Sequence, residues 1–233
     1  VVSTIPSGAL KESSSSTTAR CSVKLSAGSS SVTMMCGSIT TVTVVGSVLA
    51  LPYGDQDLSA AARHAPDRYQ QAQRRSREVL ADLEIPARPA VMPDNDVLTS
   101  DALRATSPET VVLLGDTAFA APPTARNSVV RLLGRDVVVT SAGAQAGGPG
   151  PTAADDPLAM RQRLLSEAAL RTIDGVRAPI VMSLPARWSP RNPEAFLSAF
   201  DSRWLSSVSV SDVADRAAPA LPTSSLAYTA AEI

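Results

Sequence analysis

Short, continuously apolar runs alternate with amphipathic stretches from about residue 48 to residue 216. Apolar runs of this length, bounded by turn residues, predict buried strands. The predicted strands are Val48–Leu51, Ala87–Met92, Val111–Leu114, Val137–Thr140 and Ile180–Leu184, with Trp204–Val210 as a final extended piece. The amphipathic stretches predict helices over Asp57–His64, Asp67–Leu83, Ser100–Ala105, Ala125–Leu133, Pro157–Ile173 and Pro193–Phe200.

Two of these helices carry additional signals. Asp155 or Asp156 can cap the helix over Pro157–Ile173. Pro157 suits the first turn of that helix. In the helix over Asp67–Leu83, the Arg and Gln positions form a solvent face. Its apolar positions are expected to face the core; they are Val79, Leu80 and Leu83.

Strands that are apolar throughout are buried on both faces, and intervening helices are the usual connections of a parallel sheet. The sequence therefore predicts an α/β fold, a parallel-strand sheet with helices on both faces. The number of strand–helix units fits either an open doubly wound sheet or part of a (β/α) barrel. We expect this α/β domain to cover residues 48–216 and residues 217–233 to form a tail.

Residues 1–47 have a different composition, with 20 Ser or Thr and both lysines of the chain. Three interpretations are open: a poorly ordered exported linker, a wrong reading frame or start, or one or two real strands. Thr40–Val45 is the best strand candidate. Cys21 and Cys36 could form a disulfide in an oxidising compartment, and their spacing matches no zinc motif.

Composition argues against several partners. A net charge of −1 and 3% aromatic residues give no reason to expect nucleic acid or an anionic membrane as partner. No run approaches the roughly 18 apolar residues of a membrane span. The nearest candidate, Ile39–Leu51, is short and interrupted by Thr, Gly and Ser. The N-terminus also lacks the pattern of a secretory signal.

Several chemistries are excluded by missing residues. The single histidine, His64, cannot supply the two-histidine, one-aspartate metal site of polysaccharide deacetylases. No G-x-S-x-G elbow is present, and no Lys after Lys24 is available for a phosphate-binding loop. The glycine- and proline-rich stretch 148–153 fits a flexible loop better than a dinucleotide fingerprint. We therefore expect neither a metal nor a cofactor.

Polar side chains follow the predicted strands at their carboxyl ends, where α/β folds place their functional sites. In chain order they are Tyr53, Asp55 and Asp57, then Asp94 and Asp96, then Asp116, Ser141, Arg187 and Trp188. Paired carboxylates could act as acid and base on a glycosidic bond. The alternative is that each acid caps the helix that follows, as Asp57 is well placed to do.

The candidates divide by chemistry. The catalytic candidates are Asp55, Asp94 and Asp116, and the ligand-binding candidates are Tyr53, Asp55, Arg187 and Trp188. Asp55 leads because it follows Gly54, which allows close backbone approach, and because Asp57 is the better helix cap. Tyr53 can contact a sugar, whereas Trp188 is either a stacking platform or a buried anchor.

The stretch Val48-Leu-Ala-Leu-Pro-Tyr-Gly-Asp-Gln-Asp57 resembles the "LPY-x-D-x-D" segment of a family of large exported actinobacterial proteins of unknown function. Members are often labelled secreted glycoproteins and are typically encoded near a lipid II flippase. The resemblance continues through Val137–Ala142, Leu164–Leu170 and Ala178–Trp188, and it ends near Ala214. It implies an upstream signal peptide, a sugar-hydrolase- or deacetylase-like barrel, and downstream β-rich domains with a membrane anchor. Residues 1–47 lack the family's "W-x-x-D-P" strand, which favours a wrong frame or start there.

We therefore expect an exported, extracytoplasmic cell-envelope protein whose barrel-like domain binds a cell-wall glycan or an envelope protein. The first alternative is a metal-independent carbohydrate hydrolase that uses paired carboxylates. The second alternative is a non-functional fragment. The resemblance supplies no catalytic residue, because none is established for the family.

Overall fold

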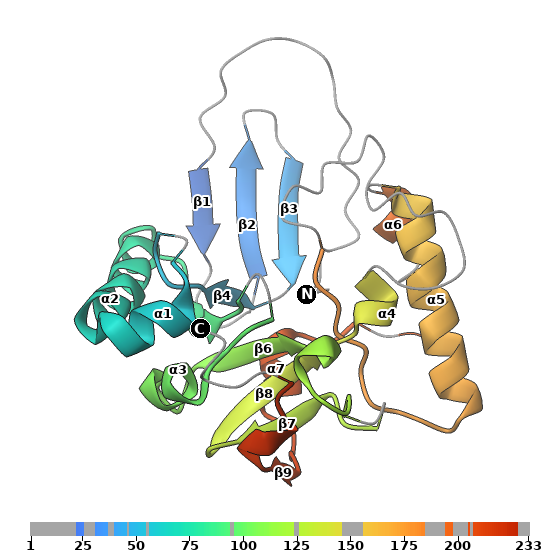
Figure 1. Ribbon diagram of the computed structural model, residues 1–233. Coiled ribbons are helices and arrows are strands. Elements are labelled where there is room, and N and C mark those ends of the chain that lie inside the picture. The colour runs from blue at the N-terminus through green and yellow to red at the C-terminus, as the bar shows by residue number, and fades with distance from the viewer. Residues whose placement is uncertain are drawn as a thin grey trace.

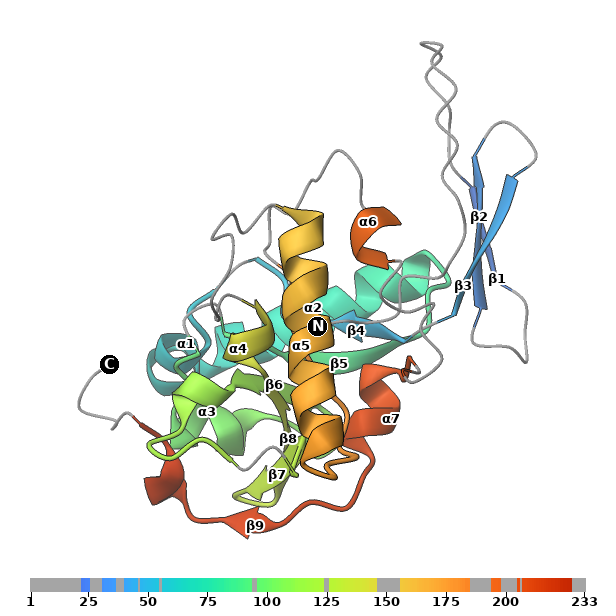
Figure 2. The same cartoon turned by 90° about the vertical axis from the view of Figure 1, so that its right-hand side faces the viewer.

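The structure of the protein is a computed structural model, shown in two orthogonal views in Figures 1 and 2. It describes the backbone of residues 22–25, 31–36 and 40–45. From residue 47 onward it describes residues 47–54, 56–93, 96–123, 126–145, 156–184, 194–197, 205 and 207–227.

A six-stranded, mostly parallel sheet forms the centre of the fold. Its strands, in spatial order, are β4 (Val48–Ala50), β5 (Ala87–Val91), β6 (Val111–Gly115), β8 (Arg135–Thr140), β7 (Val129–Leu132) and β9 (Ala220–Leu221). The first four are parallel to one another and lie in the order in which they occur in the chain, although β7 comes between β6 and β8 in the sequence. The predicted α/β fold with a parallel sheet is confirmed at this level.

Helices connect the strands. They are α1 (Leu58–His64), α2 (Pro66–Asp82), α3 (Ser100–Ala105), α4 (Ala142–Gln145), α5 (Pro157–Ile173), α6 (Glu194–Leu197) and α7 (Val210–Ala214). The predicted cap of α5 is present, since the Asp156 carboxylate accepts a hydrogen bond from the Leu158 N–H at 2.9 Å. Among the described residues, no helix is both long and apolar enough to cross a membrane.

Both faces of the sheet are covered, because alternate residues of each strand point to opposite sides. On one face, Val112 and Leu114 of β6 pack with Leu58 of α1 and Leu103 of α3. On the other face, Val111, Leu113 and Val138 pack with Val181, Val210 and Val213. Figure 2 shows α3 and α7 on opposite sides of the strands. A third apolar cluster joins α4, α5 and α6; it contains Ala144, Met160, Leu164, Met182 and Phe196.

The prediction of a helix over Ala125–Leu133 is wrong for the residues of this range that the structure describes. Val129–Leu132 is strand β7, which pairs antiparallel with β8. The two-residue turn between them, Leu133 and Gly134, has φ values of +50° and +76°. Positive φ at both positions is the geometry of a type I′ hairpin turn, which favours Asn, Asp or Gly at the first position. Leucine at that position hid the hairpin from the sequence pattern.

Two other predictions need correction. Ile180–Leu184 is not a strand of the sheet; the Ser141 N–H, one residue past the end of β8, donates to the Val181 carbonyl at 2.7 Å. Leu83 does not face the core, since it is 58% exposed and follows the last residue of α2. The buried side chains of α2 are Tyr69 and Ala72 instead.

Within residues 1–47, the structure describes a separate antiparallel sheet of β1 (Ser22–Leu25), β2 (Ser31–Cys36) and β3 (Thr40–Val45). The strand predicted at Thr40–Val45 is therefore present as β3. Cys21 lies outside the described residues, so the disulfide stays a prediction. At the other end, the segment predicted as a tail contributes β9 and a buried Leu226 to the α/β unit.

The strained turn at Leu133 provides a test of the hairpin. Leu133→Asn should raise the free energy of unfolding by about 1 kcal/mol, because leucine in the left-handed region costs about 1–2 kcal/mol. In a chain of this size, the melting temperature should rise by about 2–4 °C. The matched control is Leu132→Asn, which places an amide at a fully buried position and should destabilise strongly. A lower melting temperature for Leu133→Asn would contradict the turn geometry.

The boundary near Ser47 can be tested by truncation. A chain beginning at Ser47 should keep cooperative unfolding, with its melting temperature within about 2 °C of the full chain. The physical reason is that β1–β3 share no described strand pairing with the six-stranded sheet. A chain beginning at Tyr53 also removes β4, which pairs with β5, and should be clearly less stable. If the Ser47 chain unfolds instead, residues 1–47 belong to the core.

Candidate functional site

The carboxyl ends of β4, β5, β6 and β8 meet at one edge of the sheet because these strands are parallel. Of the catalytic and ligand-binding candidates at this edge, the structure describes Tyr53 and Asp116. The other predicted site residues lie outside the described residues; they are Asp55, Asp94, Arg187 and Trp188.

Asp57 is the cap of α1, as predicted. One of its carboxylate oxygens accepts hydrogen bonds from the backbone N–H of Ser59 at 3.0 Å and of Ala60 at 2.9 Å. These two groups have no partner inside the helix, so the carboxylate satisfies donors that every helix start leaves open.

Asp116 connects two strand ends. It directly follows β6, and its carboxylate accepts a hydrogen bond from the backbone N–H of Ala142, the first residue of α4, at 3.1 Å. Ala142 follows the end of β8 by two residues. The carboxylate therefore stabilises the start of a helix that belongs to the neighbouring strand.

Asp96 connects the end of β5 to the end of β6. One carboxylate oxygen accepts from the backbone N–H of Gly115 at 2.8 Å, and the other accepts from the Thr117 hydroxyl at 3.0 Å. Its backbone φ is +57°, in the left-handed region that Asp tolerates better than most residues. A side chain at Gly115 would overlap this carboxylate, which explains why glycine ends β6.

Ser141 also has a structural partner. Its hydroxyl accepts a hydrogen bond from the Ala144 N–H at 3.3 Å, and the residue is buried. The described polar groups at the sheet edge therefore hold the strand-to-helix turns in place. No group of three or more His, Cys, Asp or Glu side chains that could bind a metal occurs in the described part of the chain.

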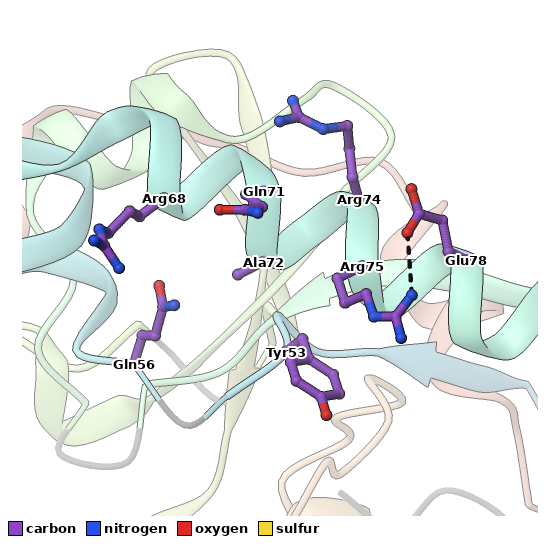
Figure 3. Close-up of a pocket in the computed structure, with 8 residues that line it drawn as sticks. All are labelled: Tyr53, Gln56, Arg68, Gln71, Ala72, Arg74, Arg75 and Glu78. Carbon is purple, nitrogen blue, oxygen red and sulfur yellow. Dashed lines mark ion pairs between the residues drawn. The ribbon is translucent and has the colours of Figure 1, made fainter.

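A hollow of about 500 Å³ lies beside this edge, between the loop after β4 and one face of α2 (Figure 3). Tyr53 forms one wall, with 57% of the residue exposed. Its backbone N–H donates to the carbonyl of Ala72 at 3.1 Å, which attaches the loop to the middle of α2. Gly54, with a φ of +94°, supplies a backbone conformation that other residues rarely adopt.

The opposite wall is a row of polar side chains on α2. Arg68, Gln71, Arg75 and Glu78 are spaced by three or four residues and so lie on one helix face. Ala72 forms the floor, and Gln56 and Arg74 complete the lining. Arg75 forms an ion pair of 3.6 Å with Glu78 (Figure 3). The sequence pattern assigned these positions to a solvent face. Their spacing in the sequence shows that they share one face of the helix, but it does not show that Tyr53 lies beside that face.

Comparison with known protein families, with curated proteins and with solved structures gives no match for this chain. The resemblance to the exported actinobacterial family therefore stays a prediction.

The contact between Asp96 and Gly115 gives a test of the sheet edge. Gly115→Ala should lower the free energy of unfolding by about 1–3 kcal/mol, because the added methyl group displaces the Asp96 carboxylate. Gly143→Ala in α4 is the matched control, since its Cβ would meet atoms no closer than 3.8 Å. Urea unfolding of both variants measures the difference. Equal stability of Gly115→Ala and the parent chain would show that Asp96 does not occupy this position.

Proposed function

We propose that the protein is an exported cell-envelope protein that binds a glycan without turnover, through the hollow between Tyr53 and α2. The observation that carries the proposal is an exposed aromatic side chain that lines one hollow together with a row of amide, guanidinium and carboxylate groups. A tyrosine ring offers an apolar face that can pack on the C–H face of a sugar, together with a hydroxyl. The facing Gln and Arg side chains can exchange hydrogen bonds with sugar hydroxyls.

The strand-end carboxylates favour binding over hydrolysis. A glycosidase needs two carboxyl groups about 5–10 Å apart that face the substrate in a cleft. Asp116 and Asp96 instead accept hydrogen bonds from backbone N–H groups of Ala142 and Gly115. Their oxygens act in positioning neighbouring segments, so turnover by these two acids is the weaker alternative.

The topology supports the barrel-like architecture that the family resemblance implies. In a (β/α) barrel, neighbouring strands follow one another along the chain, whereas a doubly wound sheet reverses its order at a switch point. The order β4-β5-β6-β8 is sequential and parallel, as in part of a barrel. The antiparallel β7 beside β8 departs from that pattern. The envelope location rests on the resemblance of residues 48–57 and 178–188.

Tyr53→Ala tests the proposal. Cell-wall glycan fragments from an actinobacterium should bind the parent chain in calorimetric titrations, and Tyr53→Ala should weaken that binding at least about tenfold, or about 1.4 kcal/mol. The change lies at an exposed position, so the melting temperature should stay nearly constant. Leu83→Ala, an equally exposed apolar position outside the hollow, is the control and should bind normally.

Turnover is measured in the same samples by the release of reducing ends. No release is expected, and Asp116→Asn should bind as the parent chain does. Release that disappears in Asp116→Asn would favour the hydrolase. Absence of any glycan binding, with a folded parent chain, would overturn the proposal and favour a protein partner or a non-functional fragment.

A further inference from the structure

We infer that the glycan is acidic, carrying carboxylate or phosphate groups that bind Arg68 and Arg75 across the face of α2. This inference rests on the proposed glycan-binding function and adds the charge class of the ligand. It also predicts that Tyr53 and the arginines of α2 contribute separately to the binding energy.

The lining of the hollow has an excess of positive charge. Three arginines line it, Arg68, Arg74 and Arg75, against one acid, Glu78, an excess of two charges (3 − 1 = 2). The whole chain has a net charge of −1, so the charge of the hollow is opposite in sign to the net charge of the protein.

These cations are weakly neutralised by the protein itself. The Arg75–Glu78 pair is 3.6 Å long, with side chains 56% and 60% exposed, and such exposed pairs contribute little. Within the described ranges, no ion pair involves Arg68 or Arg74. The guanidinium groups are therefore available to a ligand, and Arg is the side chain best suited to bidentate contact with carboxylate or phosphate.

The spacing fits more than one contact on the same ligand. Arg68 and Arg75 are seven residues apart, which places them about 10 Å apart along the helix axis on the same face. Figure 3 shows Arg68 on the side of Gln56 and Arg75 on the side of Tyr53. A volume of about 500 Å³ is within the range of small-molecule sites. An acidic oligosaccharide can thus contact Tyr53 and both cations together.

The first experiment compares ligands that differ only in charge. The probes are a short oligogalacturonate, its neutral methyl ester, and a sugar phosphate beside the corresponding neutral sugar. We expect the acidic member of at least one pair to bind about tenfold or more tightly, with an affinity that falls as salt rises. The oligogalacturonate pair tests binding of a carboxylate, and the sugar phosphate pair tests binding of a phosphate. Equal binding of acidic and neutral probes would overturn this inference and leave the proposed glycan binding intact.

The second experiment uses charge variants on one helix. Arg68→Gln and Arg75→Gln should each remove most of the preference for the acidic probe while leaving binding of the neutral probe within about twofold, since Gln keeps hydrogen-bonding capacity. Glu78→Gln should strengthen binding of the acidic probe, because it releases Arg75 from its ion pair. All three positions lie on the helix surface, and melting temperatures verify folding.

Arg77→Gln is the matched control for net charge. Arg77 is exposed on α2 but does not line the hollow, and it lies about two and a half turns from Arg68, on the opposite face. It should leave the preference for the acidic probe unchanged. An equal loss in Arg77→Gln and Arg68→Gln would show a general charge effect and overturn the site. Absence of binding by every probe, acidic or neutral, would count against the proposed function itself.

Discussion

The complete burial of β6 is the constraint on which the α/β unit depends. All five residues of Val111–Gly115 are buried, and the four valine and leucine side chains point alternately to the two faces of the sheet. Each such side chain stabilises the fold by about 1.5–3 kcal/mol when removed from water. This gain requires cover on both faces, and α1 and α3 provide it on one side while α7 and the segment around Val181 provide it on the other.

Burial of the central strand also determines the chemistry available at its carboxyl end. The N–H of Gly115 at the end of β6 and the N–H of Ala142, two residues past β8, need acceptors, and Asp96 and Asp116 provide them. The carboxylates engaged in this way hold neighbouring strand ends together. The edge strand β4 is less constrained, because it is half-buried and the loop that follows it is largely exposed. The hollow lined by Tyr53 and the polar side chains of α2 lies beside this strand.

The sequence was informative wherever one local pattern decides the outcome. Continuous apolar runs predicted β6 and β8, and capping residues predicted the starts of α1 and α5. It failed at β7, where the turn at Leu133 uses a residue that the turn type disfavours. It could not reveal the hollow, because the contact between the Tyr53 N–H and the Ala72 carbonyl joins a loop to the middle of a helix. Nothing in either segment alone predicts that contact.

The charged side chains of α2 give little support to its helix dipole. A helix dipole favours acids in the first turn and bases in the last, by about 0.3–1 kcal/mol each. The first turn of α2 contains both Asp67 and Arg68, whose opposite charges offset each other, and the last turn contains Asp82 and no base. Ala65, the capping residue, makes no side-chain hydrogen bond to the helix start. Pro66, the first residue of α2, has no N–H, and the N–H groups of Arg68 and Tyr69 donate to the Ala65 carbonyl at 3.0 and 3.1 Å. The acidic ligand that we infer would therefore meet the Arg68 guanidinium rather than open backbone donors. Side chains of α2, and not its backbone start, would therefore provide the contacts to such a ligand.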